Sequence, residues 1–373
     1  MNQDKIWLSS PHMGGNEQKY VKEAFDTNWV APLGPNVTGL ENDLENYLNN
    51  TIHVAALSSG TAAIHLSLIL LGVKAGDEVI CQSMTFSASA NPILYLGATP
   101  VFIDSEKDTW NLCPIALEEA IIDRIAKGNK PKAIIGVHLY GMPFKVDEIA
   151  AISKKYNIPL IEDSAEALGS TYKNQNCGTF GSFGILSFNG NKIITTSGGG
   201  ALVCNNKEDK DKAVFYATQS RDNAPHYEHS HIGYNYRMSN ICAGIGRGQM
   251  EVLDLRVKQR RNNYDFYFNN LDKNKFSFLN EPVGYYSNRW LSTILVNENH
   301  SFNREDVRLA LEKENIEARP LWKPMHLQPI FANYPYYGKN VSETLFEQGL
   351  CLSSGSNLTK EDLNRVLKVL EQF

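Results

Sequence analysis

One lysine of the chain stands apart from the others. Lys192 lies in the stretch FGILSFNGNKIITTSGGG, and it is the only lysine between Lys173 and Lys207. Small, uncharged neighbours would leave its amine partly desolvated, which favours the neutral, nucleophilic form. The glycines that follow permit close approach of the backbone to a ligand. An isolated loop lysine is normally solvated, so this interpretation depends on the groups that accompany it.

Two other stretches put suitable groups at the ends of predicted strands. The apolar run IPLIEDSA ends in Glu162 and Asp163, where ligands of open α/β sheets bind, but the doublet alone does not say which acid faces a ligand. In LSSGTAAIHLSLILLG a strand is expected to end at Leu57 and a helix to begin at Gly60. Residues 59–61 could therefore hold a phosphate at the positive end of the helix, although an ordinary N-cap explains this fragment alone more simply.

The elements that would position these groups follow from the hydrophobic pattern. From His53 onward, short apolar runs alternate with helix-length amphipathic segments, which is typical of a parallel sheet with crossover helices. Later come a mostly helical segment over residues 238–271, the strand RWLSTILV and helices near residues 304–315 and 360–373. We expect a large α/β domain over residues 1–245, with a mainly parallel sheet flanked by helices, and a smaller α+β domain over residues 246–373.

Composition excludes several classes of function. The 373 residues carry a formal net charge of -5 and no stripe of Lys and Arg, so nucleic acid is not an expected partner. The N-terminus has no signal-peptide pattern, and the longest apolar stretch, residues 61–73, is too short to span a bilayer. We therefore expect a cytoplasmic protein with no membrane partner. Six scattered cysteines without a CxxC pair indicate reduced thiols and no structural zinc.

The motifs taken together resemble one family. SSGT, MTFSAS, IEDSAEALGS, SFNGNK followed by TTSGGG, and GYNYRMSN are similar in kind and order to the DegT/DnrJ/EryC1/StrS sugar aminotransferases, over nearly the whole chain. These enzymes have the pyridoxal phosphate (PLP) fold type I, which is aspartate aminotransferase-like. Within the family, PHMGGNE, residues 28–34, HYEH, SNRWLST and RPLWKPMH resemble bacterial enzymes that aminate UDP-4-keto-6-deoxy-N-acetylglucosamine on the way to bacillosamine.

The resemblance implies a role for each matching residue. Lys192 would hold PLP covalently and later move a proton between the cofactor and the sugar, and Asp163 would pair with the protonated pyridine nitrogen. Glu166 occupies the position near the ring hydroxyl, where many relatives have Gln or His. The other cofactor contacts implied are Phe86 on the ring face and, at the phosphate, Ser59, Gly60, Thr61, Ser187 and Asn235 of a second subunit. The implied substrate contacts are Pro32, Leu33, Gly34, Arg237, Arg319 and His326.

The implied reaction has two halves. L-glutamate would convert the cofactor to pyridoxamine phosphate (PMP), and a nucleotide-linked 4-keto-6-deoxy sugar would then take the amine at C4, within a homodimer that shares its active sites. A GDP- or dTDP-linked sugar, or amination at C3, stays open. Sugar dehydratases on the same scaffold replace the lysine with histidine, so Lys192 argues against them. A non-catalytic regulatory protein would be expected to lose Lys192 or Asp163.

Two other motifs resemble binding sites of other kinds, and we expect neither kind of site. GIGRG, at residues 244–248, resembles the start of a dinucleotide fingerprint, but Gln249 follows and no strand precedes it, so we expect no nicotinamide site. HYEHSH has the density of a metal site, with His226, Glu228, His229 and His231. A polar loop near the active site is the preferred interpretation, and we expect no metal.

Overall fold

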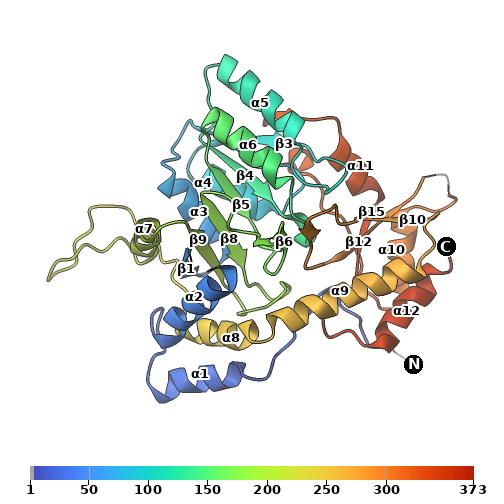
Figure 1. Cartoon of the computed structure of the whole chain (residues 1–373), viewed down its shortest axis with the longest axis horizontal. Helices are drawn as coiled ribbons and strands as arrows, with labels where there is room; N and C mark the ends of the chain where they lie inside the picture. The colour runs from blue at the N-terminus through green and yellow to red at the C-terminus, as the bar shows by residue number, and fades with distance from the viewer. Residues whose placement is uncertain (1–3, 50, 299) are drawn as a thin grey trace.

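The computed structural model describes residues 4–49, 51–298 and 300–373, and its centre is an eight-stranded sheet (Figure 1). The strand order is β1-β9-β8-β5-β4-β2-β3-β14, and β9 alone runs antiparallel to its two neighbours. The prediction of a mainly parallel sheet is therefore confirmed. The strands are β1 (His53–Leu57), β2 (Glu78–Gln82), β3 (Thr99–Ile103), β4 (Ala133–Val137), β5 (Leu160–Asp163), β8 (Phe183–Ser187), β9 (Gly200–Cys204) and β14 (Tyr336–Tyr337).

Helices cover both faces of this sheet, which is why its strands are apolar almost throughout. Side chains alternate between the faces: Leu57 and Ile135 belong to the core under one face, whereas Ala56 and Ile134 belong to clusters under the other. The first face carries α3 (Gly60–Leu70), α4 (Asn91–Tyr95) and α7 (Lys207–Ala217), and the second carries α2 (Pro35–Leu48), α5 (Pro114–Ala126), α6 (Val146–Tyr156) and α8 (Asn240–Met250).

A second, antiparallel sheet lies in the C-terminal part of the chain (Figure 1). Its core also takes in Ile6, which forms an isolated bridge with Ile316. The domain boundary expected at residue 245 falls inside α8 and stays a prediction. The elements are β10 (Phe276–Phe278), β12 (Ser292–Val296), β15 (Gly349–Leu352), β13 (Arg319–Pro320), α9 (Leu253–Asn270), α10 (Arg304–Lys313) and α12 (Lys360–Leu370).

The remaining elements connect these two parts. The helical segment expected over residues 238–271 consists of α8 and α9, because a turn at Glu251 and Val252 interrupts it and Val252 leaves the helical conformation, with φ -117° and ψ 8°. Within the described residues, no helix has both the length and the apolar character needed to cross a membrane. The other elements are α1 (Glu17–Asp26), α11 (Val341–Gln348), the small sheet β11 (Tyr285–Tyr286), β6 (Thr171–Tyr172) and β7 (Gln175–Asn176), and three short 3-10 turns at Ser87–Ser89, Leu139–Gly141 and Met325–Leu327.

Candidate active site

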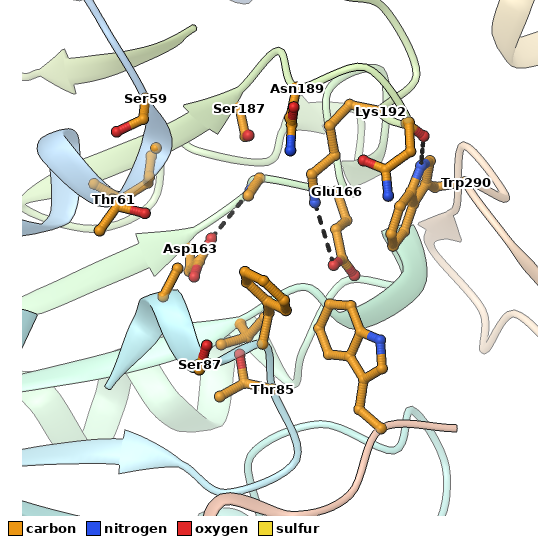
Figure 2. Close-up of a pocket in the computed structure, with 18 of the residues that line it drawn as sticks. Ser59, Thr61, Thr85, Ser87, Asp163, Glu166, Ser187, Asn189, Lys192 and Trp290 are labelled. Atoms are coloured by element: carbon orange, nitrogen blue, oxygen red, sulfur yellow. Dashed lines mark hydrogen bonds and ion pairs between the residues drawn. The ribbon is translucent and has the colours of Figure 1, made fainter. Parts of the chain in front are cut away.

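A cavity of about 810 Å³ opens where β5 and β8 end and α3 begins, and residues of the C-terminal part close its other side. This is the place where ligands of open α/β sheets bind. Figure 2 shows Asp163, Glu166 and Lys192 directed into the cavity. The predicted site residues that line it are Ser59, Gly60, Thr61, Phe86, Asp163, Glu166, Ser187, Lys192 and Arg319.

The two adjacent acids of β5 face opposite ways. Asp163 lines the cavity and accepts a hydrogen bond from Ser89 Oγ at 2.6 Å. Glu162 is fully buried on the other side, where it accepts bonds from the backbone N–H groups of residues 178, 180 and 181 and lies 3.0 Å from His138 Nε2. Of the two carboxylates that the sequence offered, Asp163 is the one available to a ligand.

Lys192 lies between a carboxylate and an aromatic face. Its Nζ is 3.5 Å from Glu166 Oε1 and 4.4 Å from the centre of the Trp290 ring. The lysine side chain is only 11% exposed, so the amine is held inside the cavity rather than in bulk solvent. Its short loop follows β8, and the N–H of Lys192 donates to Asn189 O at 3.0 Å.

Glu166 is a buried carboxyl group with an unusual protonation equilibrium. Burial raises its pKa from the ordinary 4.5 to about 7, although the charge of Lys192 and a hydrogen bond from the N–H of Tyr140 favour the ionised form. The negative charge of Asp163 acts in the same direction as burial. The carboxyl therefore exchanges its proton close to neutral pH, within reach of the lysine amine.

The opposite end of the cavity is built around the first turn of α3. Ser59 caps this helix through its Oγ, which accepts the N–H of Ala62 at 3.0 Å. The ordinary N-cap is thus present, and it places residues 59–61, with the hydroxyl groups of Ser59 and Thr61, at the positive end of the helix dipole. Glycine keeps the strand and the helix close, since a Cβ on Gly200 would lie 2.3 Å from Gly60 N. Ser187 pairs with Gly200 at the same point.

These groups fit a phosphate-bearing pyridine cofactor. The turn of residues 59–61 offers hydroxyl and N–H groups to an anion. Phe86 is 58% exposed although it lines the cavity, so its ring face is open to a planar ligand. Asp163 supplies a carboxylate and Lys192 an amine on the walls between them.

Several predicted residues lie outside the cavity lining. Asn235 is exposed and forms an isolated bridge with Thr218. Arg237 is bound to Glu41 at 2.5 Å. His326 lies 2.6 Å from Ser83 Oγ and stacks on a tyrosine ring. Pro32, Leu33 and Gly34 lie in the turn before α2, and Leu33 is 54% exposed. The roles of these six residues stay predictions.

The histidine-rich loop has little of a metal site's geometry. His226 Nε2 lies 3.4 Å from a Glu228 oxygen, whereas His229 Nδ1 contacts the backbone of Gln219. Within residues 4–49, 51–298 and 300–373, no group of three or more His, Cys, Asp and Glu side chains could hold a metal ion. GIGRG lies inside α8.

The structure also brings in residues that the motifs did not single out. Ser89 follows Phe86 in a 3-10 turn and bonds Asp163. Trp290 and Trp322 come from the C-terminal part and line the cavity with Asn189. The serine spacing in MTFSAS was the one sequence signal available for Ser89, because a turn of three residues returns its side chain toward the strand end.

Comparisons with known proteins indicate the family of this chain. The family model described as the DegT/DnrJ/EryC1/StrS aminotransferase family matches residues 11–371. EpsN of Bacillus subtilis (strain 168), named as a pyridoxal phosphate-dependent aminotransferase, is 53% identical over 371 residues, which cover 98% of this chain and 95% of EpsN. A GDP-perosamine synthase of Escherichia coli O157:H7 is 36% identical over 368 residues, covering 99% of this chain and 98% of that protein.

Solved structures of a sugar aminotransferase have the same fold and identify the cofactor. Spr1654 of Streptococcus pneumoniae, named as a sugar aminotransferase, superposes in its PMP form with a TM-score of 0.90 at 26% identity over 98% of both chains. Its PLP form superposes with a TM-score of 0.89 at 26% identity over 99% of both chains. The cofactor is pyridoxal phosphate, with pyridoxamine phosphate as its half-reaction form, and this aminotransferase belongs to the DegT/DnrJ/EryC1/StrS family.

Proposed function

We propose that this aminotransferase moves an amino group from L-glutamate to C4 of UDP-4-keto-6-deoxy-N-acetylglucosamine, for a bacterial surface glycan or for protein glycosylation. The observation that carries the proposal is the arrangement of Lys192, Asp163 and residues 59–61 around one cavity. A nucleotide-linked sugar is supported by the relative named as a GDP-perosamine synthase. The UDP-linked 4-keto sugar is supported by the resemblance of PHMGGNE, SNRWLST and RPLWKPMH.

The cavity residues proposed to bind the cofactor would each have a task in this reaction. When bound, the cofactor supplies an electron sink for the carbon that exchanges its proton. Lys192 would move that proton, and the carboxylate of Asp163 would keep the pyridine nitrogen protonated. Phe86 would pack against the ring, and Glu166 would serve the region of the ring hydroxyl. Ser59, Gly60, Thr61 and Ser187 would hold the phosphate at the start of α3.

The substrate would lie on the open side of the cavity. Arg319 lines it there, and its side chain is 69% exposed and paired with Glu317 at 2.7 Å. A diphosphate could recruit this cation with little rearrangement. Pro32, Leu33, Gly34, Arg237 and His326 are proposed as further substrate contacts, within a cytoplasmic enzyme.

A second subunit would complete the site. Asn235 belongs to GYNYR, and the resemblance assigns it to the partner's cofactor phosphate. Two surface features favour a protein contact. One is an arm over residues 221–232 that extends from the body beside α7 (Figure 1). The other is a set of large exposed apolar side chains such as Phe25 and Val30. Ile232, the last residue of the arm in the sequence, is 83% exposed. A homodimer with shared sites accounts for both.

Mixing two damaged proteins tests the shared site. Lys192→Ala subunits combined with Asn235→Ala subunits would form mixed dimers in which one site has both native residues and the other has neither. With free exchange of subunits, about a quarter of all sites would regain activity. A monomer in light scattering at assay concentration, turning over at the full rate, would contradict the proposal.

A panel of sugars tests the substrate. Purified enzyme with PLP is expected to absorb in the near-visible range and to lose that band when L-glutamate is added. The PMP form is then offered UDP-, GDP- and dTDP-linked keto sugars, and the product's amino position is determined by NMR. A GDP-linked 4-keto sugar is the second candidate, since the relatives named as GDP-perosamine synthases match nearly the whole chain. A preference for a 3-keto sugar would overturn the C4 assignment.

A further inference from the structure

The loop that carries Lys192 is clamped by hydrogen bonds from distant parts of the chain. Asn191 O accepts bonds from Ser9 Oγ and from the indole N–H of Trp290, both at 2.7 Å. Arg260, which is 1% exposed, donates to Trp290 O at 2.6 Å, to Ser9 Oγ at 2.9 Å and to Lys192 O at 3.4 Å. These bonds fix the backbone of the loop and the position of the indole relative to one another.

With these hydrogen bonds in place, one face of the Trp290 indole is directed toward Lys192. Lys192 Nζ is 4.4 Å from the ring centre and 3.5 Å from Glu166 Oε1 (Figure 2). The indole is 2% exposed, and Tyr140 and Trp322 pack around it with ring centroids 6.5 and 6.3 Å away. An ammonium over a desolvated indole face is attracted by the ring's quadrupole, and the hydrogen bond to Asn191 prevents the ring from turning away.

We propose that Trp290 is a positioning residue for the Lys192 amine. The indole face and the Glu166 carboxylate confine Nζ to one direction whenever the amine is free, which is when it must meet the cofactor or move a proton. Neither Trp290 nor Arg260 needs to touch the cofactor for this. The inference rests on the proposed role of Lys192 as the residue that holds PLP.

A comparison of PLP with PMP distinguishes a residue that positions the Lys192 amine from a residue that supports the pocket as a whole. PLP is captured through the Lys192 amine, whereas PMP carries its own amine and binds through phosphate and ring contacts alone. Cofactor-free wild type, Trp290→Phe and Trp290→Leu are mixed with PLP, and the capture rate is followed by absorbance. The affinity for PMP is measured on the same proteins by calorimetry. Trp110→Leu is the matched control, because Trp110 belongs to the same core cluster as Trp290 but does not line the cavity.

We expect Trp290→Leu to slow PLP capture about 5- to 30-fold and Trp290→Phe about 3-fold, because a phenyl ring keeps a weaker π face but loses the bond to Asn191. PMP affinity should stay within about 2-fold of wild type in both variants. Trp110→Leu should change neither quantity. If Trp290→Leu does not fold, Trp290→Phe alone decides.

Each other outcome has a distinct meaning. Wild-type capture rates in the Trp290 variants would overturn the positioning role. A parallel loss of PMP affinity would also overturn it, because Trp290 would then support the pocket as a whole. A wild-type enzyme that captures PLP elsewhere than at Lys192, as shown by reduction with borohydride and peptide mapping, would refute the proposed function instead.

Discussion

Replacing Glu166 by glutamine should make the cofactor-free protein more stable at alkaline pH and leave it unchanged in acid. Burial holds the pKa of Glu166 at about 7 in the folded chain, against an ordinary 4.5. Between these two values the folded state keeps a proton that the unfolded state has lost, so the stability contributed by the protonated carboxyl declines as pH rises through this window. Above pH 7 the loss is complete, and it corresponds to about 3 kcal/mol.

Glutamine has the shape of the protonated carboxyl and does not titrate. It can still accept the N–H of Tyr140, which Glu166 Oε2 accepts at 2.7 Å. For 373 residues unfolding together, about 3 kcal/mol corresponds to a rise of about 4 °C in the melting temperature at pH 8. The difference between variant and wild type should vanish near pH 4.5. Cofactor-free protein is required, because bound cofactor adds its own stabilisation.

Glu17 offers a control of opposite sign. Burial raises its pKa, but hydrogen bonds from Gly14, Gln249 and Gly15 outweigh burial and lower the pKa overall. This carboxylate stabilises the fold above pH 4.5 and loses that contribution as pH falls through its lowered pKa. Glu17→Gln should therefore be less stable than wild type at neutral pH. A difference for Glu166→Gln that stays constant from pH 4.5 to 8 would refute the reasoning.

Three further substitutions test two residues of the cavity wall and the buried acid beside one of them. Lys192→Ala should abolish turnover and still give a folded protein that binds PMP, as calorimetry can measure, because the phosphate and ring contacts come from other residues. Asp163→Asn should keep the fold and lower kcat by orders of magnitude, because an unpaired pyridine nitrogen loses its proton. Glu162→Gln should instead lower stability by about 3 kcal/mol or more, measured by urea unfolding, because it weakens bonds to buried N–H groups.

Local patterns predicted much of the fold and one half of the site. The alternation of apolar runs and amphipathic segments predicted the parallel sheet, and the turn before Gly60 predicted the start of α3 correctly. The choice of Asp163 over Glu162 and the inclusion of Ser187 came from the family resemblance and not from a local pattern. Carboxyl ends of parallel strands meet at one edge of a sheet, so the acids that end β5 were expected at the ligand-binding edge. These inferences need only the sequence near each residue and a rule about sheets.

The other half of the site depends on contacts across long stretches of chain. Trp290 is almost one hundred positions from Lys192, and Ser9 is farther still, yet both bond Asn191 O. Arg260 lies on the long helix α9, which has no clear apolar stripe to reveal that Arg256 and Arg260 are both buried. No periodicity in the sequence specifies these contacts between distant residues, because the contacts depend on how the C-terminal part packs against the sheet.

Glu162 and Asp163 show which part of the site follows from the local sequence and which part depends on contacts with other segments. Strand geometry dictates that adjacent side chains face opposite ways, so one acid had to be internal and the other available. The choice depends on the loop after β7, whose N–H groups at residues 178, 180 and 181 surround Glu162. The buried carboxylate of Glu162 is stable among these N–H groups because it accepts several charge-assisted hydrogen bonds from them. Its neighbour Asp163 is thereby directed into the cavity. The structural acid thus determines the orientation of the functional one.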